Sequence, residues 1–314
     1  MTDASESKTS SSVLMIRPVH FQSNPQTAES NRFQQQGPSS ADENIHEMAL
    51  AEFNNLAVAL EAAGINVVIF DDTLEPHTPD SIFPNNWLST HADGTAVLYP
   101  MMAGNRRPER REDILASLSA DHGFNIAQTL DLSSFEAEEK YLEGTGSVVL
   151  DRDNHIAYAC KSARTDLDLL GEFARKMGYE VVAFSALDED GNAIYHTNVM
   201  MCTGLDFAVI CSECIAEEER AAVLNRLRDT GHEVIDISFA QMASFAGNML
   251  ELKSANGERI IAMSSQALNS LDDEQRTALS GRARIVSSPI DTIETSSGGS
   301  VRCMLAEIHL PVRA

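Results

Sequence analysis

The sequence predicts an α/β fold in which five similar units surround a pseudo-fivefold axis. Five short segments recur along the 314-residue chain, with anchor residues 57, 53, 52 and 55 positions apart. The anchors are Asn86, Glu143, His196, Asn248 and Cys303. Periods of this length are typical of propellers and solenoids. Any α/β protein alternates strands and helices at a similar spacing, but each anchor falls at the start of a predicted first strand, and this shared position favours a repeat.

Each of the first four anchors is followed by a strand, a tight turn, a strand, a helix and a third strand. The second unit shows this order best, with strands at 147–150, 156–160 and 180–184 and a helix at 165–177. Within that helix, apolar residues at i, i+3, i+4 and i+7 predict one buried face. They are Leu170, Phe173, Ala174 and Met177. Gly178 follows, where a glycine can end the helix.

The remaining units carry the turn and cap residues that this order requires. Asp93-Gly94 and Asn256-Gly257 are typical of hairpin turns in the first and fourth units. Helices predicted at 216–230 and 271–279 are followed by Gly231 and Gly281, which we expect to cap them.

The fifth unit is split between the two ends of the chain. Residues 303–310 supply its first strand, and a strand at 13–19, a helix at 43–63 and a strand at 65–70 supply the rest. A unit shared by both termini closes a ring, so we expect one domain over 13–314. Residues 1–12 are polar and rich in serine, and we expect them to form a disordered tail.

Charge and composition exclude several classes of protein. Acidic residues outnumber basic ones 47 to 23, for a net charge of −24, which disfavours nucleic acid and anionic membranes as partners. No apolar run approaches the roughly 18 residues of a spanning helix, and no apolar core of a secretory signal follows Met1. The five cysteines are an odd number, so we expect reduced thiols in a cytoplasmic protein.

Two of the cysteines, Cys211 and Cys214, form a CxxC sequence between a predicted strand and helix. This is the context of a thioredoxin-like redox site, but the acidic residues Glu213 and 217–219 would disfavour thiol ionisation. A structural pair of thiols is the interpretation we favour. No second CxxC or histidine pair accompanies it, so we expect no metal, and no glycine fingerprint indicates a nucleotide cofactor.

The anchors would converge at the axis, where strand ends readily form a site. A thiol becomes a nucleophile when it loses its proton, and a nearby histidine can accept that proton. A carboxylate can orient the imidazole. Cys303, His196 and Glu143 are therefore candidate catalytic residues. A single cysteine is more often a small buried apolar residue, but the shared place of these three in the repeat favours catalysis.

Several segments resemble motifs of the guanidino-group-modifying enzymes, the pentein superfamily. Residues 143–146 (Glu-Gly-Thr-Gly) resemble its acidic, glycine-containing segment, His196 its catalytic histidine, and 299–303 (Gly-Ser-Val-Arg-Cys) its C-terminal nucleophile motif. Members include arginine deiminases, dimethylargininases, agmatine deiminases, succinylarginine dihydrolase and amidinotransferases. The resemblance covers nearly the whole chain from Val13 and implies a five-bladed α/β-propeller of ββαβ repeats.

The resemblance also implies substrate-binding residues. Asp80, in the segment Pro-Asp-Ser-Ile-Phe, resembles the dimethylargininase aspartate that contacts the reacting group. Arg106 and Arg164 resemble the arginines of that branch that bind the substrate α-carboxylate. The stretch 21–38 is rich in Pro, Gln and Asn and resembles a segment of the citrulline-hydrolysing branch; we interpret it as a lid.

Two departures from the superfamily pattern bear on the substrate. Arginine-processing members carry acids where this chain has Asn85 and Asn86, and arginine deiminases place an aspartate where it has Asn198. Carboxylates offset the cost of burying a guanidinium cation. Amides are neutral but keep donors and acceptors that suit a ureido group. A single acid, Asp80 or Glu143, could still suffice for a guanidinium.

We therefore expect a cysteine hydrolase that uses neither a metal nor a cofactor. Its expected reaction converts citrulline to ornithine, ammonia and carbon dioxide. Cys303 would attack the ureido carbon, and His196 would protonate the leaving amine and later activate water. Glu143 and Asp80 would bind the ureido N–H groups, and Asn85 or Asn86 the carbonyl. A small amino acid is the predicted partner, and a homodimer is compatible with the sequence.

Three alternatives stay open at this point. The enzyme could produce citrulline from arginine or dimethylarginine, or it could be an amidinotransferase in which an amine replaces water. A non-catalytic scaffold is the third, because one superfamily member that binds ribosomal subunits is inert. The presence of Glu143, His196 and Cys303 together argues against a scaffold, which has no need of them.

Overall fold

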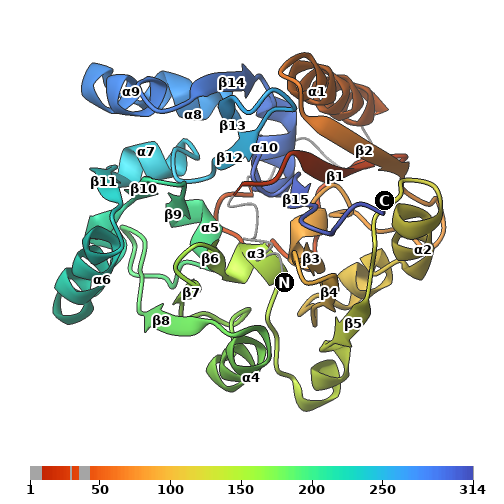
Figure 1. The fold of residues 1–314 in the computed structure, drawn as a ribbon, viewed down its shortest axis with the longest axis horizontal. Helices are drawn as coiled ribbons and strands as arrows, with labels where there is room; N and C mark the ends of the chain where they lie inside the picture. Colours follow the sequence, from red (N-terminus) through yellow and green to blue (C-terminus); the bar gives the residue numbers. More distant parts are fainter. Residues whose placement is uncertain (1–8, 29, 35–42, 314) are drawn as a thin grey trace.

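The computed structural model describes residues 9–28, 30–34 and 43–313. Over these residues the chain forms five three-stranded sheets around a central axis (Figure 1). In each sheet the first strand of the unit pairs antiparallel with the second, and the second pairs parallel with the third. The predicted ring of five ββαβ units is confirmed.

Each sheet has an inner, a middle and an outer strand. The inner strands are β3 (Leu88–Thr90), β6 (Val149–Asp151), β9 (Met201–Thr203), β12 (Leu250–Lys253) and β15 (Ala306–Glu307). The middle strands are β1 (Ser12–Arg17), β4 (Thr95–Leu98), β7 (Ile156–Cys160), β10 (Phe207–Ile210) and β13 (Arg259–Ser264). The outer strands are β2 (Asn66–Asp71), β5 (Gln128–Asp131), β8 (Glu180–Phe184), β11 (Glu233–Asp236) and β14 (Arg284–Ser288).

Parallel strands need a crossover connection, and helices on the outside of the ring provide it (Figure 1). These outer helices are α1 (Glu43–Ala62), α2 (Glu112–Ala120), α4 (Leu167–Met177), α6 (Glu217–Asp229), α8 (Ser265–Ser270) and α9 (Asp273–Ser280). Three short helices lie nearer the axis: η1 (Pro84–Asn86), α3 (Gly144–Ser147) and α5 (Thr197–Met200).

Helix α4 shows why the local sequence specifies these elements. The Asp166 side chain accepts a hydrogen bond from the Leu169 backbone N–H, so the helix begins at Leu167 rather than at 165. Gly178 ends it with a φ of 75°, a left-handed conformation that favours glycine. The predicted face, with Phe173 at its centre, is buried against the sheet.

The two termini share one sheet, as the split unit predicts. Strand β15 pairs antiparallel with β1, which in turn pairs parallel with β2. Residues 1–8 of the expected tail lie outside the described residues, but its last part belongs to the fold. Ser10 is buried and its hydroxyl donates to the Ile308 carbonyl at 2.7 Å, and Ser12 begins β1. The boundary at residue 13 is therefore wrong by at least three residues.

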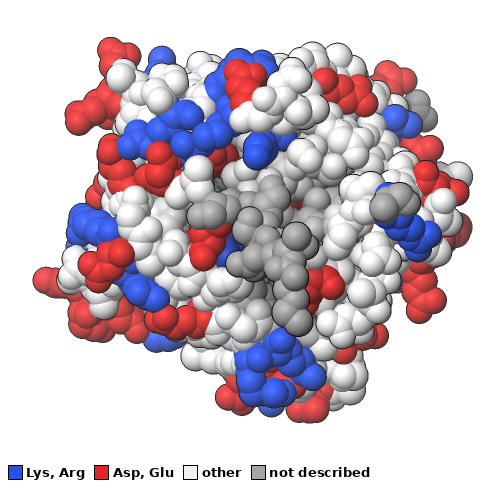
Figure 2. Space-filling view, viewed as in Figure 1, with Lys and Arg blue, Asp and Glu red and all other residues white. Residues whose placement is uncertain are grey.

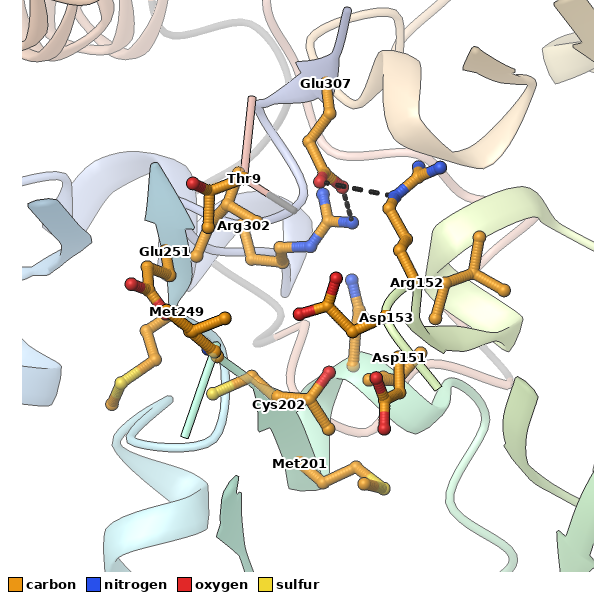
Figure 3. Close-up of a pocket in the computed structure, with 17 residues that line it drawn as sticks. Thr9, Asp151, Arg152, Asp153, Met201, Cys202, Met249, Glu251, Arg302 and Glu307 are labelled. Carbon is orange, nitrogen blue, oxygen red and sulfur yellow. Dashed lines mark hydrogen bonds and ion pairs between the residues drawn. The ribbon is translucent and has the colours of Figure 1, made fainter. Parts of the chain in front are cut away.

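A small polar pocket of about 50 Å³ lies among the inner strands β6, β9, β12 and β15 (Figure 3). There the Glu307 carboxylate accepts from Arg302 Nη2 at 2.8 Å and lies 3.7 Å from Arg152 Nε. Burial alone would raise the pKa of Glu307, but the two guanidinium groups hold it well below its usual value. This ion-pair cluster fixes the chain next to Cys303.

Charged side chains of both signs are interspersed around the rim of the face seen in Figure 2. Among the helices that the structure describes, none is both long and apolar enough to cross a lipid bilayer.

Candidate active site

The five anchor residues surround the axis on the short segments that precede the inner strands. Asn86 ends η1, and Glu143 and His196 are the N-cap residues of α3 and α5. Asn248 and Cys303 lie in loops just before β12 and β15. The sequence predicted that each anchor begins the first strand of its unit. In the structure the anchors lie before these strands instead. Strand side chains alternate between the two faces of a sheet, whereas these segments let every anchor face the axis.

Cys303 lies between two amide side chains. Its Sγ accepts hydrogen bonds from Asn198 Nδ2 at 3.4 Å and from Asn248 Nδ2 at 3.3 Å. The thiol is only 4% exposed. Hydrogen bonds to an ionised acceptor are stronger than those to a neutral one, so the two amide donors are placed to stabilise negative charge on the sulfur during a reaction. Asn248 also accepts from the Arg302 backbone N–H at 3.0 Å, which ties the nucleophile turn to it.

His196 and Glu143 form a buried pair beside the thiol. His196 Nε2 lies 2.8 Å from Glu143 Oε2, which also accepts from Arg164 Nη1 at 3.2 Å. Burial alone would raise the pKa of Glu143, but Arg164 and His196 hold it well below its usual value. Burial lowers the pKa of His196 to about 4, although Glu143 opposes this shift. The imidazole is therefore neutral at physiological pH and ready to accept a proton.

A glycine makes room for the imidazole. A Cβ on Gly146 would lie 2.7 Å from His196 Nδ1 and 2.4 Å from Asn86 Nδ2, distances that real Cβ atoms do not show. The glycine in the segment 143–146 thus allows the ring to lie close to the backbone of α3. Since Nε2 is bonded to Glu143, Nδ1 is the nitrogen left to exchange a proton with a substrate.

Arg106 is held by protein groups rather than left free for a substrate. Its Nε and Nη2 donate to the two oxygens of Glu109, each at 2.9 Å, and its Nη1 donates to Asn86 Oδ1 at 2.9 Å. Because these protein groups engage its guanidinium, the arrangement does not support the expected role of Arg106 in binding the substrate α-carboxylate. Glu109, which the sequence analysis missed, lies three residues further on; that spacing is the only sequence signal for the pair.

Asp80 lies across the cavity from His196, with one carboxylate oxygen bonded and the other free of a protein partner. Its Oδ2 accepts from Asn24 Nδ2 at 2.7 Å and from the Thr27 hydroxyl at 3.3 Å, and lies 3.7 Å from Arg106 Nε. Its Oδ1 is buried without a hydrogen bond. A buried acceptor without a donor is costly, so Oδ1 is placed to receive a donor from a ligand.

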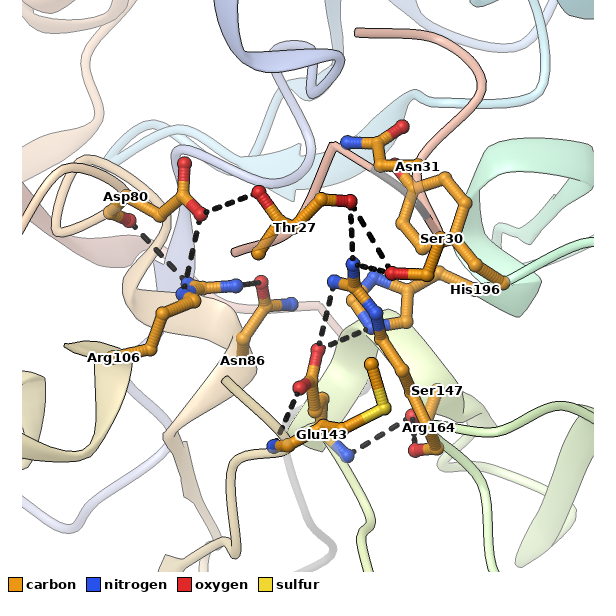
Figure 4. Close-up of polar contacts among 12 residues, drawn as sticks. Thr27, Ser30, Asn31, Asp80, Asn86, Arg106, Glu143, Ser147, Arg164 and His196 are labelled. Atoms are coloured by element: carbon orange, nitrogen blue, oxygen red, sulfur yellow. Dashed lines mark hydrogen bonds and ion pairs between the residues drawn. The ribbon is translucent and has the colours of Figure 1, made fainter. Parts of the chain in front are cut away.

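The described part of the segment 21–34 closes over the site (Figure 4). Arg164 Nη2 donates to the Ser30 hydroxyl at 2.5 Å and to the Thr27 carbonyl at 3.4 Å, and its guanidinium stacks over the Tyr195 ring at 4.9 Å. Asn31 donates to the Ser297 carbonyl at 2.9 Å. Oxygen atoms of this segment thus accept the hydrogen bonds of Arg164, the arginine that was expected to bind the substrate α-carboxylate.

The cavity enclosed in this way is small. Its volume is about 10 Å³, the space of about one water molecule. It is lined by Thr27, Asn31, Asp80, Phe83, Asn86, Arg106, Arg164, Tyr195, His196, Ser297, Gly298, Gly299 and Cys303. An amino acid cannot enter without displacement of the segment 21–34, which we hereafter call the lid. Residues 29 and 35–38 of the predicted lid lie outside the described residues.

The three asparagines singled out from sequence have different surroundings. Asn86 lines the cavity, and its Nδ2 has no partner. Asn198 contacts Cys303 and carries an unpartnered Oδ1. Asn85 is fully buried, does not line the cavity, and has no partner for either side-chain polar atom. Asn248 was an anchor of the repeat but not a predicted site residue, and its place in the repeat was the signal that could have identified it.

Cys211 and Cys214 lie away from this site. Both are buried, and none of the five cysteines forms a disulfide. Neighbouring Cys211 and burial together raise the pKa of Cys214 far above its usual value. Within the part of the chain that the structure describes, no three His, Cys, Asp or Glu residues are grouped to hold a metal ion.

Solved structures with the same fold include guanidino-group enzymes. The N-terminal domain of ArgZ, a cyanobacterial arginine dihydrolase solved as a substrate-bound cysteine mutant, matches 95% of this chain and 97% of its own, with 17% identity and a TM-score of 0.72. AgrE matches with 18% identity and a TM-score of 0.73, and there this chain covers 40% of the AgrE chain. A dimethylarginine dimethylaminohydrolase adduct with S-methyl-L-thiocitrulline matches 94% of this chain and 98% of its own, with 13% identity and a TM-score of 0.61.

A family model provides the sequence-level link. Comparison with curated proteins gave no match. The model described as eukaryotic N,N dimethylarginine dimethylhydrolase matches residues 17–310, nearly the whole chain. The chain therefore belongs to the N,N-dimethylarginine dimethylhydrolase family, within the pentein superfamily of guanidino-group-modifying enzymes.

Proposed function

We propose that this protein is a cysteine hydrolase that cleaves the ureido group of citrulline, giving ornithine, ammonia and carbon dioxide. The reaction class rests on family membership, on Cys303 and His196 at one cavity, and on Glu143, which is bonded to His196. The finer assignment, a ureido rather than a guanidinium substrate, rests on the side chains around the sulfur.

The observation that carries this assignment is that amides, not carboxylates, surround Cys303 Sγ. Asn198 and Asn248 donate to it, and Asn86 lines the same cavity with a free Nδ2 donor. The carboxylate of Glu143 is already engaged by His196, Arg164 and the Met102 backbone N–H. A buried guanidinium needs a carboxylate close to its charge, whereas a neutral ureido group needs donors for its C=O and acceptors for its N–H.

These groups support a two-step reaction. Cys303 Sγ bonds to the ureido carbon while its proton passes to His196. The C–N bond to the ornithine side chain then breaks, and His196 gives the proton to the leaving amine. A carbamoyl group remains on Sγ. Water attacks that carbonyl carbon, His196 takes a proton from the water and returns it to the sulfur, and the released carbamic acid breaks down to ammonia and carbon dioxide.

Substrate binding requires the lid to open. When Ser30 and Thr27 move away, Arg164 becomes available for the α-carboxylate of an amino acid. Asp80 Oδ1, which is buried and unpartnered, is placed to accept an N–H from the substrate. Reclosure would exclude bulk water from the intermediate. Arg164 keeps the predicted role in this proposal, and Arg106 instead supports Asp80 and Asn86.

A second candidate is hydrolysis of arginine or dimethylarginine to citrulline. The free oxygen of Asp80 favours it, because one buried carboxylate oxygen could compensate part of a guanidinium charge. ArgZ, which has the same fold, is an arginine dihydrolase. In that case the same residues would act, but ammonia or dimethylamine would leave with the proton from His196. The amidino carbon on Sγ would stay bonded to the ornithine side chain, and attack by water would release citrulline.

The test is product identification by mass spectrometry with citrulline, arginine, dimethylarginine and agmatine offered separately. We expect ornithine and ammonia from citrulline, and no product from the Cys303→Ser variant. Citrulline formed from arginine or dimethylarginine, with no turnover of citrulline, would contradict the ureido assignment but not the family. Asn86→Asp should shift preference toward the guanidinium substrates; an unchanged preference would remove the argument from the amides.

A further inference from the structure

A second cavity, of about 250 Å³, lies beside the lid. Its walls come from lid residues Arg32 and Phe33, the loop 188–190, helix α7 (Phe239–Ala243) with Phe245, and helix α10 (Asp291–Ser297). None of its lining residues lines the catalytic cavity. It is therefore separate from the proposed reaction site but shares the lid with it.

One side of this second cavity is apolar. The Phe33 ring packs against Phe245, with ring centroids 5.4 Å apart, and against Tyr195 at 6.2 Å. Phe239 and Met242 of α7 complete this side. Aromatic rings can hold both an aliphatic chain and a cation placed over a ring face.

The other side is acidic. Four carboxylates line the cavity, from Asp188, Glu189, Asp190 and Glu294, against the single guanidinium of Arg32. Arg32 is exposed and donates to Asn192 Oδ1 at 3.3 Å. A cavity with this excess of negative charge favours a cation over a neutral or anionic ligand.

Glu294 is the residue that points most strongly to a ligand. Its side chain is 2% exposed, its Oε1 accepts from the Ser300 hydroxyl at 2.5 Å, and its Oε2 has no hydrogen-bond partner. Burial raises the pKa of Glu294 to about 7, although the Ser300 and Ser264 hydroxyls oppose the shift. A cation bound next to Glu294 would favour its ionised form. A buried carboxylate oxygen without a donor is costly, and an N–H from a ligand in the cavity would satisfy it.

We propose that this cavity binds a small organic cation, an amine or guanidinium group on an aliphatic stem. The carboxylates of Glu294 and of residues 188–190 would contact the charged end of the ligand, and its aliphatic stem would pack on Phe33 and Phe245. An occupant would contact both the lid and α10, whose Glu294 is bonded to Ser300, three residues before Cys303. Because it contacts the closed lid, it would stabilise the closed state.

The test uses ligand-observed NMR titration of the full chain with n-butylammonium, and with 1-butanol as the neutral probe of equal size. We expect 1-butanol to bind at least about tenfold more weakly than n-butylammonium, because one charge-assisted contact raises the affinity by about that factor. Glu294→Gln keeps an acceptor for Ser300 and should weaken n-butylammonium binding by a similar factor. Glu258→Gln, at an exposed carboxylate paired with Arg284, should change nothing.

A further readout is hydrogen exchange of the lid, which should slow when n-butylammonium is bound. Equal affinity of wild type and Glu294→Gln, or equal affinity for the two probes, would overturn the proposal. So would loss of binding in Asp80→Asn, because the cation would then occupy the catalytic cavity. If Glu294→Gln does not fold, the exposed double variant Glu189→Gln, Asp190→Asn replaces it, with weaker binding expected and unchanged binding refuting the site.

Discussion

Replacing Asn248 with aspartate would test whether amide donors stabilise the negative charge that develops on Cys303 Sγ when the thiol loses its proton. Asn248 Nδ2 lies 3.3 Å from Cys303 Sγ, and Asn248 Oδ1 accepts from the Arg302 backbone N–H at 3.0 Å. Aspartate has nearly the same shape as asparagine. It keeps the acceptor for Arg302 but replaces the amide that donates to the sulfur, and to the Asn198 carbonyl at 2.8 Å, with a second oxygen. The substitution therefore changes hydrogen bonding and charge with little change in packing.

The expected loss follows from these distances. A hydrogen bond to a charged group contributes about 1.5–3 kcal/mol, so loss of the donor alone would reduce the thiolate population about tenfold to a hundredfold. An ionised aspartate 3.3 Å from the thiolate would add repulsion of about 5 kcal/mol at an effective dielectric constant of roughly 20. Part of that repulsion would be relieved by protonation of the new carboxylate, so the tenfold loss is the minimum expected.

The assay is the rate of Cys303 alkylation by iodoacetamide as a function of pH, with kcat/KM measured in parallel. In Asn248→Asp, both rates should fall at least about tenfold near neutral pH and recover as the pH is raised. Cys303→Ser supplies the background from the other thiols, and Asn225→Asp, on the exposed face of α6, is the matched control. An unchanged pH profile in a folded Asn248→Asp protein would refute the role of the amide.

Two further predictions concern the imidazole. Gly146→Ala places a Cβ 2.7 Å from His196 Nδ1 and should lower kcat by about a hundredfold, the effect of misplacing a catalytic group by about 1 Å. The control Gly171→Ala, at a position on α4 with open space around it, should not lower kcat. A fully active Gly146→Ala enzyme would contradict the close approach of the imidazole to α3. Glu143→Gln should lower kcat by about a hundredfold or more, because the imidazolium loses its carboxylate. Since burial lowers and Glu143 raises the pKa of His196, the acid limb of kcat/KM should move to lower pH, and a shift to higher pH would be inconsistent with this pairing.

The fold was predictable because local patterns agree with the tertiary arrangement. In the second unit, strands β7 and β8 have the predicted bounds, since a turn precedes β7 and the helix-ending Gly178 precedes β8. Strand β15 departs furthest from its predicted bounds: the predicted strand at 303–310 is reduced to Ala306–Glu307. Cys303 lies instead in the turn that brings its sulfur to the axis, and the local apolar pattern does not distinguish such a turn from a strand.

Within the site, the sequence correctly grouped residues that share a place in the repeat. His196, Glu143 and Cys303 meet because a fivefold ring brings equivalent positions together. Partners outside the repeat could not be assigned in this way. Arg106 is held by Glu109, and Asn85 does not line the cavity, because those outcomes depend on how η1 packs on its neighbours.

The five ββαβ units, the unit shared by both termini and the meeting of Cys303, His196 and Glu143 at the axis can be predicted from the sequence, because each follows from periodicity or local pattern. The donors that face Cys303 Sγ, the arginine that the lid covers and the place of the second cavity can be assigned only from the folded chain. These depend on contacts between segments far apart in the chain, such as Ser30 with Arg164 and Asn248 with Cys303. No local preference encodes such contacts, since they form only when the ring closes.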